Sequence, residues 1–221
     1  MKAYKKALVV GSSGLVGNFL LKILLFDIHY NEVEIWSRTP SEISHLKLKE
    51  KIVDYDAMAE MEVTPFDDVY CCLGTTIRKA KSKEAFRKVD FDYVVELAKY
   101  SVKAGASKFI VVSSLGANIK SSNFYLRTKG EMEEAVKALA IPGIYIVRPS
   151  LLLGKRNDFR FGEYLAKKFM KFFGRFMIGK LKKYKGIHAK AVAKAMHFQS
   201  RRENPEIITI DANEILKIGN T

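Results

Sequence analysis

Three glycines within seven residues, between a short apolar run and a helical pattern, constrain the fold of this chain more than any other feature. Lys6–Val10 is typical of a buried strand and leads directly into Gly11-Ser12-Ser13-Gly14-Leu15-Val16-Gly17. Leu15–Phe26 then has the apolar spacing of a helix. Such a turn allows close backbone approach and leaves free amides at the positive end of a helix. The loop predicts a site for dinucleotide phosphates. Its GxxGxxG spacing departs from the common GxGxxG fingerprint, and a sharp turn without a ligand is the alternative.

The rest of the chain alternates strand and helix patterns. Further strands are expected at 33–37, 52–53, 68–73, 108–112, 144–147 and 207–210, and longer helices at 84–104 and 123–139. Apolar strands separated by helices indicate parallel βαβ units with helices on both faces of the sheet. We expect an α/β fold, a doubly wound parallel sheet of Rossmann type, in one domain over 1–221. The strand at 207–210 is expected at the sheet edge, before a short terminal helix.

Positive charge is concentrated in one segment. The formal net charge is +14, and residues 155–185 hold 11 Lys or Arg against two acidic residues, so this segment carries +9 of it. One interpretation is an amphipathic helix that docks on an anionic membrane or nucleic acid. The other is a lid whose apolar stripe covers a cleft. We favour a small basic helical lid or lobe over 155–200, whose cations attract an anionic membrane surface or an acidic protein. No specific nucleic-acid partner is predicted.

Targeting signals and cysteine use suggest a location. The N-terminal apolar run is too short for a secretory signal, and no run approaches the roughly 18–20 apolar residues of a membrane span. The two cysteines, Cys71 and Cys72, are adjacent and cannot form an ordinary bridge with each other, which fits a reducing compartment. We therefore expect a cytoplasmic protein. The cysteines are interpreted as packing residues and the four histidines lack metal-ligand spacing, so no metal is predicted.

The end of the second strand bears on which dinucleotide is bound. An NAD site needs an acid there for the ribose 2′-hydroxyl, whereas an NADP site needs a cation for the 2′-phosphate. The strand ends in Ser37-Arg38, and Glu34 lies inside the strand, away from the tip. Arginine presents a planar, permanently charged fork suited to phosphate. We predict NADP, with a solvated surface arginine as the alternative.

A tyrosine and a lysine four residues apart supply candidate chemistry. Tyr125 and Lys129 share one helix face. A nearby cation favours the phenolate and makes a phenol usable as a general acid or base. Ser113 or Ser114, at the end of a parallel strand, could orient a carbonyl oxygen, and the two adjacent serines leave that choice open. A second such pair, Tyr164 and Lys168, lacks this context and is set aside.

Several segments together resemble the short-chain dehydrogenase/reductase superfamily, and in particular its atypical branch that contains the Tat-interacting oxidoreductase-like proteins. The resemblance runs from Ala7 to about Gly154. It is carried by the glycine loop and by Tyr70-Cys71-Cys72-Leu73-Gly74-Thr75-Thr76, Glu84-Ala85-Phe86-Arg87-Lys88-Val89-Asp90, Val112-Ser113-Ser114-Leu115-Gly116-Ala117, Ser121-Ser122-Asn123-Phe124-Tyr125, Lys129-Gly130-Glu131 and Arg148-Pro149-Ser150.

The resemblance implies a Ser-Tyr-Lys site. Tyr125 would exchange a proton with the substrate oxygen, Lys129 would hold the nicotinamide ribose, and Ser113 or Ser114 would bind the substrate oxygen. The cofactor-binding segment Leu73-Gly74-Thr75 would pass near the adenosine ribose and phosphates. Asp54 would lie by the adenine, and Pro149-Ser150-Leu151 near the nicotinamide amide.

Two functions follow from these expectations. The leading one is an NADP-dependent oxidoreductase that acts on a small carbonyl or alcohol, with Tyr125 as general acid or base. The alternative is a non-catalytic NADPH-binding regulator that docks a partner or an anionic membrane through 155–185. The expected partners are NADPH and a small-molecule substrate. The sequence leaves the oligomeric state open, and a homodimer is one of the alternatives.

Overall fold

The chain folds into alternating strands and helices, and the computed structural model describes residues 4–153 and 186–219 of it. The strands of the main sheet are β1 (Lys5–Val10), β2 (Tyr30–Ser37), β3 (Leu48–Ile52), β4 (Asp68–Cys71), β5 (Lys108–Val112), β6 (Gly143–Val147) and β9 (Ile207–Ile210). The helices are α1 (Leu15–Phe26), α2 (Ile77–Ala80), α3 (Lys83–Arg87), α4 (Tyr93–Lys103), α5 (Phe124–Lys137), α7 (Ala189–Ser200) and α8 (Ala212–Gly219). A 3₁₀ helix spans Tyr55–Glu60, a π-helical turn spans Lys88–Asp92, and β7 (Leu152–Leu153) pairs with β8 (Ile187–His188).

The main sheet is parallel throughout and has the order β3-β2-β1-β4-β5-β6-β9. The chain first winds outward from β1 to β3, then returns to pair β4 with β1 and winds the other way. Ligands of such sheets bind at the carboxyl ends of the strands, next to this reversal. The expected doubly wound Rossmann-type fold is confirmed, with β9 at one edge.

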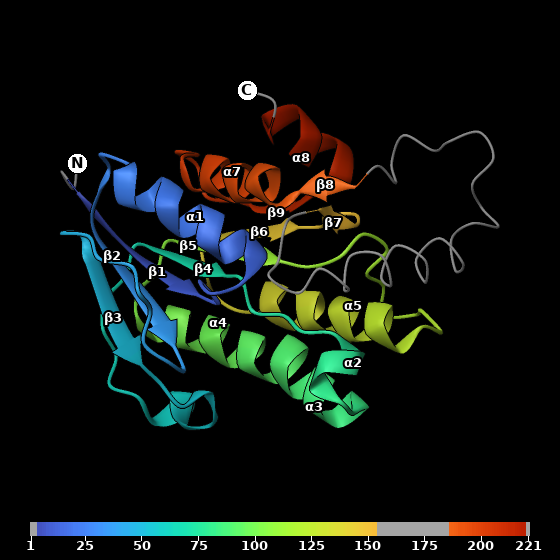
Figure 1. The fold of residues 1–221 in the computed structure, drawn as a ribbon. Helices are drawn as coiled ribbons and strands as arrows, with labels where there is room; N and C mark the ends of the chain where they lie inside the picture. The colour runs from blue at the N-terminus through green and yellow to red at the C-terminus, as the bar shows by residue number, and fades with distance from the viewer. Residues whose placement is uncertain (1–3, 154–185, 220–221) are drawn as a thin grey trace.

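Helices cover both faces of the sheet (Figure 1), and each face has its own apolar core. α1, α7 and α8 lie on one face, whereas α4 and α5 lie on the other. Because side chains alternate along a strand, Ala7 and Val9 of β1 pack toward α1 and α7, and Leu8 and Val10 pack toward α4. All four are fully buried, and burial of a Val or Leu side chain contributes about 1.5–3 kcal/mol.

Two expected elements differ from the structure. The long helix expected over 84–104 is divided into α3, the π-helical turn and α4. In the π-helical turn around Asp90 the backbone hydrogen bonds span five residues instead of four, so the helix is wider there. The third strand lies at Leu48–Ile52 rather than at 52–53. Its three consecutive charged residues, Lys49-Glu50-Lys51, lack the apolar signal of a buried strand, because β3 is an edge strand.

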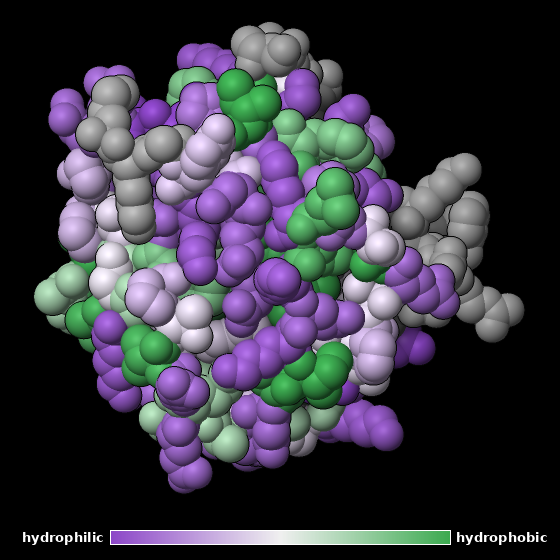
Figure 2. Space-filling model, turned by 90° about the vertical axis from the view of Figure 1, so that its left-hand side faces the viewer, coloured by the Kyte–Doolittle hydropathy of each residue, from purple (hydrophilic) through white to green (hydrophobic). Residues whose placement is uncertain are grey.

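The outer strand of the sheet, β3, carries charged side chains. The backbone groups on the free side of such a strand have no neighbouring strand to pair with. Lys49 and Glu50 are exposed, and Lys51 lies 5.9 Å from the centre of the Trp36 ring. On the face seen from the β3 side, hydrophobic residues form small groups among hydrophilic ones (Figure 2). Charged edge strands of this kind disfavour pairing with another chain.

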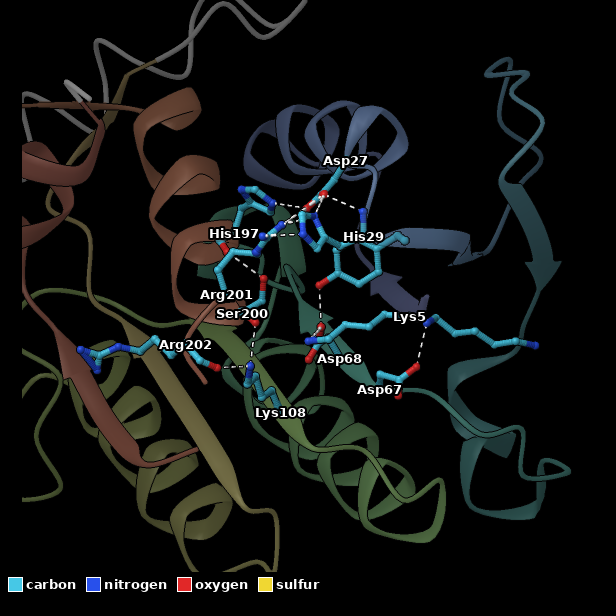
Figure 3. Close-up of polar contacts among 12 residues, drawn as sticks. Lys5, Asp27, His29, Asp67, Asp68, Lys108, His197, Ser200, Arg201 and Arg202 are labelled. Atoms are coloured by element: carbon cyan, nitrogen blue, oxygen red, sulfur yellow. Dashed lines mark hydrogen bonds and ion pairs between the residues drawn. The ribbon is translucent and has the colours of Figure 1, made fainter. Parts of the chain in front are cut away.

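A buried polar cluster closes the amino ends of the strands, opposite the edge where ligands bind (Figure 3). Asp68 at the start of β4 is fully buried, accepts a hydrogen bond from the Tyr30 hydroxyl at 2.5 Å and lies 3.1 Å from the Lys5 ammonium. The Tyr70 hydroxyl lies 2.9 Å from that of Tyr30. Burial raises the pKa of both phenols, which keeps them protonated.

At the same end of the molecule, polar contacts join α7 to β5 and to the residue after α1. Lys108 donates to the carbonyl oxygens of Ser200, the last residue of α7, and of Arg202 just beyond it, at 2.7 and 2.5 Å (Figure 3). Asp27, which follows α1, contacts His197 of α7 at 2.6 Å and His29 at 2.7 Å. Although burial opposes ionisation, these histidine contacts keep the pKa of Asp27 below its usual range.

The predicted lid or lobe over 155–200 is only partly visible. Residues 155–185, the basic segment of the sequence, lie outside the described residues. The remainder contains α7, whose Val192, Ala193 and Met196 are fully buried in the core shared with α1. α7 is therefore a layer of the Rossmann-type core.

Candidate functional site

The glycine loop is built for close backbone approach. Gly11 has a φ of +87°, which favours glycine, and a Cβ at this position would lie 2.6 Å from the carbonyl carbon of Cys72. A Cβ on Gly17 would lie 2.2 Å from the Gly11 oxygen. Gly14 donates its amide to that same oxygen at 3.0 Å. Side chains at these positions would force the loop apart.

The loop delivers the amino end of α1 to the carboxyl edge of the sheet. Gly14 caps α1, Leu15 is its first residue, and Val16 is buried behind it. Ser12 is buried and Ser13 is exposed. The first turn of α1 holds no acidic residue. Its unpaired amides and positive dipole end are therefore available to an anion.

The tip of β2 presents an arginine, as expected, and also an acid that the sequence pattern did not reveal. Arg38 is exposed, close enough to Tyr55 to oppose the burial that raises the pKa of that phenol to about 12. Glu34 accepts from the Trp36 indole at 2.6 Å and is thus engaged within the strand. Glu50 accepts from the Ser37 hydroxyl at 3.1 Å.

Glu50 shapes the loop that carries Arg38. Besides the Ser37 hydroxyl, it accepts the backbone amide of Ser41 at 2.9 Å, so it joins the last residue of β2 to the first half of the loop that follows. No spacing in the sequence could have shown this, because Glu50 reaches the tip only through the pairing of β2 with β3.

Two further predicted cofactor segments lie at the ends of β3 and β4. Asp54 is exposed and caps the 3₁₀ helix by accepting the Asp56 amide at 2.9 Å. Leu73 is buried and Gly74 is exposed. The amide of Thr75 donates to Asp90 at 2.8 Å. The strand order therefore places the 73–75 segment next to the glycine loop that follows β1.

The Tyr-Lys pair lies in the first turns of α5. Asn123 caps this helix by accepting the Leu126 amide at 3.2 Å. Tyr125 is half-buried, with its ring 5.4 Å from that of Phe86. Lys129 is buried, and its ammonium lies 2.7 Å from Asp90. Burial alone would lower the pKa of Lys129, but Asp90 and then Tyr125 raise it above its ordinary value.

The two serines at the end of β5 have different surroundings. Ser113 is buried and its hydroxyl donates to Glu133, a fully buried residue of α5. The two Glu133 oxygens share the N–H of Arg148 Nε, at 2.9 and 3.2 Å, and Arg148 Nη2 also donates to Glu133. Ser114 is half-buried, and its hydroxyl lies 3.4 Å from the carbonyl oxygen of Leu115.

The segment after β6 closes the opposite side of the site. The Pro149 carbonyl oxygen accepts the Leu115 amide at 2.9 Å, which joins the ends of β5 and β6. Ser150 is buried, and the Leu151 carbonyl oxygen accepts the Ile187 amide at 2.8 Å. All of the predicted site residues thus follow strand ends or lie on the adjoining helices at one edge of the sheet.

The cysteines have the surroundings of packing residues. Cys71 lies in the core beneath α4, and burial raises the pKa of its thiol to about 12. Cys72 packs on the other face of the sheet, 4.0 Å from the Met196 sulfur. Within 4–153 and 186–219, no group of three or more His, Cys, Asp and Glu comes together to hold a metal.

The parallel sheet order and the glycine loop at the carboxyl ends of the strands define a protein with a Rossmann-type fold. The sequence profile of the HIM1 family matches residues 25–183, and the chain belongs to this family. Protein HTATIP2 of Rattus norvegicus is 36% identical over 170 residues, which cover 75% of this chain and 70% of that protein. These findings confirm the resemblance to the atypical branch.

Solved structures show the same fold at low sequence identity. MoeE5 in complex with UDP-glucose and NAD has a TM-score of 0.68 at 16% identity, covering 97% of this chain and 80% of that one. A short chain dehydrogenase family protein from Francisella tularensis subsp. tularensis SCHU S4 has a TM-score of 0.67 at 17% identity, covering 97% of this chain and 100% of that one.

The expected cytoplasmic location is overturned by the relatives. Protein FMP52-1 of Scheffersomyces stipitis, named as mitochondrial, is 37% identical over 156 residues, which cover 68% of this chain and 69% of that protein. Other FMP52 proteins named as mitochondrial are 33–36% identical. Free cysteines indicate a reducing interior but do not distinguish between reducing compartments. In the parts of the chain that the structure describes, no helix is long and apolar enough to cross a bilayer.

Proposed function

We propose that the protein is an NADP-dependent oxidoreductase that interconverts a small carbonyl compound and its alcohol. The observation that carries the proposal is the buried Lys129 ammonium one helical turn from Tyr125, in contact with Asp90, which in turn holds the loop after β4. A buried lysine beside a phenol, next to a glycine loop at the carboxyl edge of a parallel sheet, is an arrangement suited to dinucleotide chemistry.

The residues at the carboxyl edge fit a dinucleotide along its length. The free amides at the start of α1 suit the pyrophosphate, and glycine at 11 and 17 lets the backbone approach it. Arg38 suits the 2′-phosphate of NADP. Asp54, Leu73-Gly74-Thr75 and Pro149-Ser150-Leu151 would border the remainder of the cofactor.

Tyr125 would act as the general acid in reduction. When bound, the reduced nicotinamide supplies a hydride to the carbonyl carbon, and Tyr125 donates its proton to the carbonyl oxygen. The positive charge of Lys129 stabilises the phenolate left behind. Of the two serines we assign Ser114 to the substrate oxygen, because the Ser113 hydroxyl already donates to Glu133.

Turnover by matched tyrosine variants tests this proposal. NADPH oxidation is followed across a panel of small aldehydes and ketones for the wild type, Tyr125→Phe and Tyr4→Phe, which changes an exposed tyrosine. We expect Tyr125→Phe to lose about 100-fold or more in turnover while it still binds NADPH, and Tyr4→Phe to match the wild type. NADPH binding without tyrosine-dependent turnover of any substrate would favour the non-catalytic NADPH-binding regulator.

The remaining partner predictions concern surfaces outside this site. Docking of an anionic membrane or an acidic protein was predicted for 155–185, which lies outside the described residues. Flotation with anionic liposomes tests the membrane partner, and sedimentation velocity tests the homodimer.

A further inference from the structure

A buried ion pair links the catalytic helix to the loop after β4. Lys129 is 3% exposed and Asp90 is 1% exposed. One carboxylate oxygen of Asp90 lies 2.7 Å from the Lys129 ammonium, and the other accepts the Thr75 amide at 2.8 Å. Gly74 lies close to the same carboxylate, since a Cβ at Gly74 would lie 3.5 Å from Asp90 Oδ1. One side chain thus contacts both α5 and a predicted cofactor-binding segment.

A π-helical turn places Asp90 between these two elements. The helical region from α3 to α4 widens over Lys88–Asp92, and Asp90 is the buried residue of this turn. π-helical turns are uncommon and are frequent at functional sites. Asp92, two residues further on, is exposed. The π-helical turn therefore directs the Asp90 side chain into the protein and leaves Asp92 at the surface.

The charge of Lys129 depends on this contact. A lysine removed from water tends to lose its proton, because burial disfavours the charged form. In the described chain, the titratable groups that act on Lys129 are Asp90 on the π-helical turn, Tyr125 on α5 and Cys71 on β4. Burial raises the pKa of the Cys71 thiol to about 12, so it is neutral at physiological pH. Asp90 is thus the carboxylate that compensates the ammonium.

We propose that Asp90 is a positioning residue of the dinucleotide site, which keeps Lys129 ionised in the protein interior and joins it to the 73–75 segment. The ionised ammonium would then be presented to the ribose hydroxyls of the cofactor at a fixed position. This inference rests on the proposed function for the identity of the ligand. The ionisation of Lys129 itself is a property of the protein without ligand.

The pH dependence of NADPH binding tests the proposal in a way that a purely structural role would not affect. NADPH is titrated by its fluorescence against the wild type, Asp90→Asn and the matched control Asp92→Asn between pH 7 and 9.5. The range begins at pH 7 because phosphate groups titrate near pH 6. The charged form of lysine is lost as pH rises through its pKa, so a lowered pKa in Asp90→Asn removes the ammonium within or below this range.

We expect Asp90→Asn to bind NADPH at least about tenfold more weakly than the wild type at pH 9, approaching the affinity of Lys129→Met. Asp92→Asn should follow the wild type at every pH. An Asp90→Asn profile parallel to the wild type, with an affinity within threefold (roughly 0.65 kcal/mol by RT ln 3), would overturn the proposal.

Direct titration of Lys129 in the ligand-free protein separates this inference from the proposed function. Lysine side-chain NMR signals are assigned with Lys129→Met, and pH titration should show Lys129 charged beyond pH 10 in the wild type and neutral at a lower pH in Asp90→Asn. If the wild type binds no NADPH, the proposed function fails and this titration still decides the role of Asp90. Unchanged titration of Lys129 in Asp90→Asn contradicts it.

A double variant covers the case in which Asp90→Asn does not fold. Asp90→Asn combined with Lys129→Met removes both charges, so no unpaired ammonium is left in the interior. Recovery of folding in the double variant would support the charge compensation of Lys129 by Asp90. A double variant that also fails to fold would show that the loss of folding does not come from an uncompensated Lys129 charge, which overturns the inference.

Discussion

Glu133 of α5 connects the ends of β5 and β6 behind the candidate site, and its replacement should measure how much this connection contributes to stability. Its carboxylate is fully buried on α5, receives the hydroxyl of Ser113 at the end of β5 and receives the guanidinium of Arg148 after β6. Hydrogen bonding to Glu133 raises the pKa of Arg148. Glu133→Gln keeps the side-chain shape but removes the negative charge, and it leaves the guanidinium without its counter-ion.

The magnitude follows from burial. Removal of one partner from a buried ion pair costs about 3–5 kcal/mol. The Arg148 side chain is 28% exposed, so water solvates part of the charge left behind, and we expect about 2–3 kcal/mol. With an unfolding entropy of about 2.1 cal/mol/K per residue, a chain of this length loses about 2 °C in Tm per kcal/mol. Glu133→Gln should therefore lower Tm by about 4–7 °C.

The neighbouring Glu134 provides the matched control. It pairs with Lys137 at 2.9 Å, but its side chain is 58% exposed, and exposed pairs contribute about 0–1 kcal/mol. Urea unfolding followed by circular dichroism gives the free energy of unfolding of both variants. If Glu133→Gln differs from Glu134→Gln by less than about 0.5 kcal/mol, the reasoning from burial is wrong. Arg148→Met added to Glu133→Gln should recover part of the loss.

Two further predictions concern the cofactor and acid stability. Arg38→Glu should weaken NADPH binding by at least about tenfold and NADH binding far less, because only NADPH carries the 2′-phosphate; comparable losses in fluorescence titrations would sink the NADP assignment. Asp27→Asn should destabilise the fold at pH 7 by about 2 kcal/mol, since it removes a carboxylate held by His197 and His29. The folded-state pKa of Asp27 is depressed, so this stabilisation is present above the unfolded pKa of about 3.9 and is lost as pH falls below it. Urea unfolding at pH 7 and pH 3 should therefore show a smaller difference between the two proteins at pH 3, and an equal difference at both pH values would contradict the linkage.

Ser113 and Ser114 show how tertiary contacts reduce the alternatives left by a motif. Both hydroxyls follow the same strand, and their sequence positions are equally suited to a carbonyl oxygen. Glu133 lies twenty residues after Ser113 and reaches it only because α5 packs beneath the end of β5. The loop after β5 also packs closely on α5, since a Cβ on Gly130 would lie 2.5 Å from the Asn118 backbone.

Local sequence determined the fold class and the main site segments. The loop over 11–17 specified its own geometry, because the positive φ of Gly11 and the close contacts at Gly11 and Gly17 permit only glycine there. The helix α1 and the strands β5 and β9 have the predicted bounds. Apolar periodicity was a reliable indicator there, since these elements contribute buried side chains to the core. It gave a wrong position for β3, whose edge location allows three consecutive charged residues.

Long-range packing decided the contacts that tune the site, because they join residues distant in the sequence. Asp90 and Lys129 are 39 positions apart, and the expected continuous helix over 84–104 concealed the π-helical turn that directs Asp90 inward. Glu50 reaches the Arg38 loop through strand pairing, and Glu133 reaches Arg148 through the packing of α5 on β6. A carboxylate in a sequence looks the same whether it is solvated or buried, and only the tertiary structure sets its partner and hence its charge state. The sequence alone therefore placed the glycine loop and the Tyr-Lys pair, and the fold supplied Asp90, the buried acid that contacts Lys129.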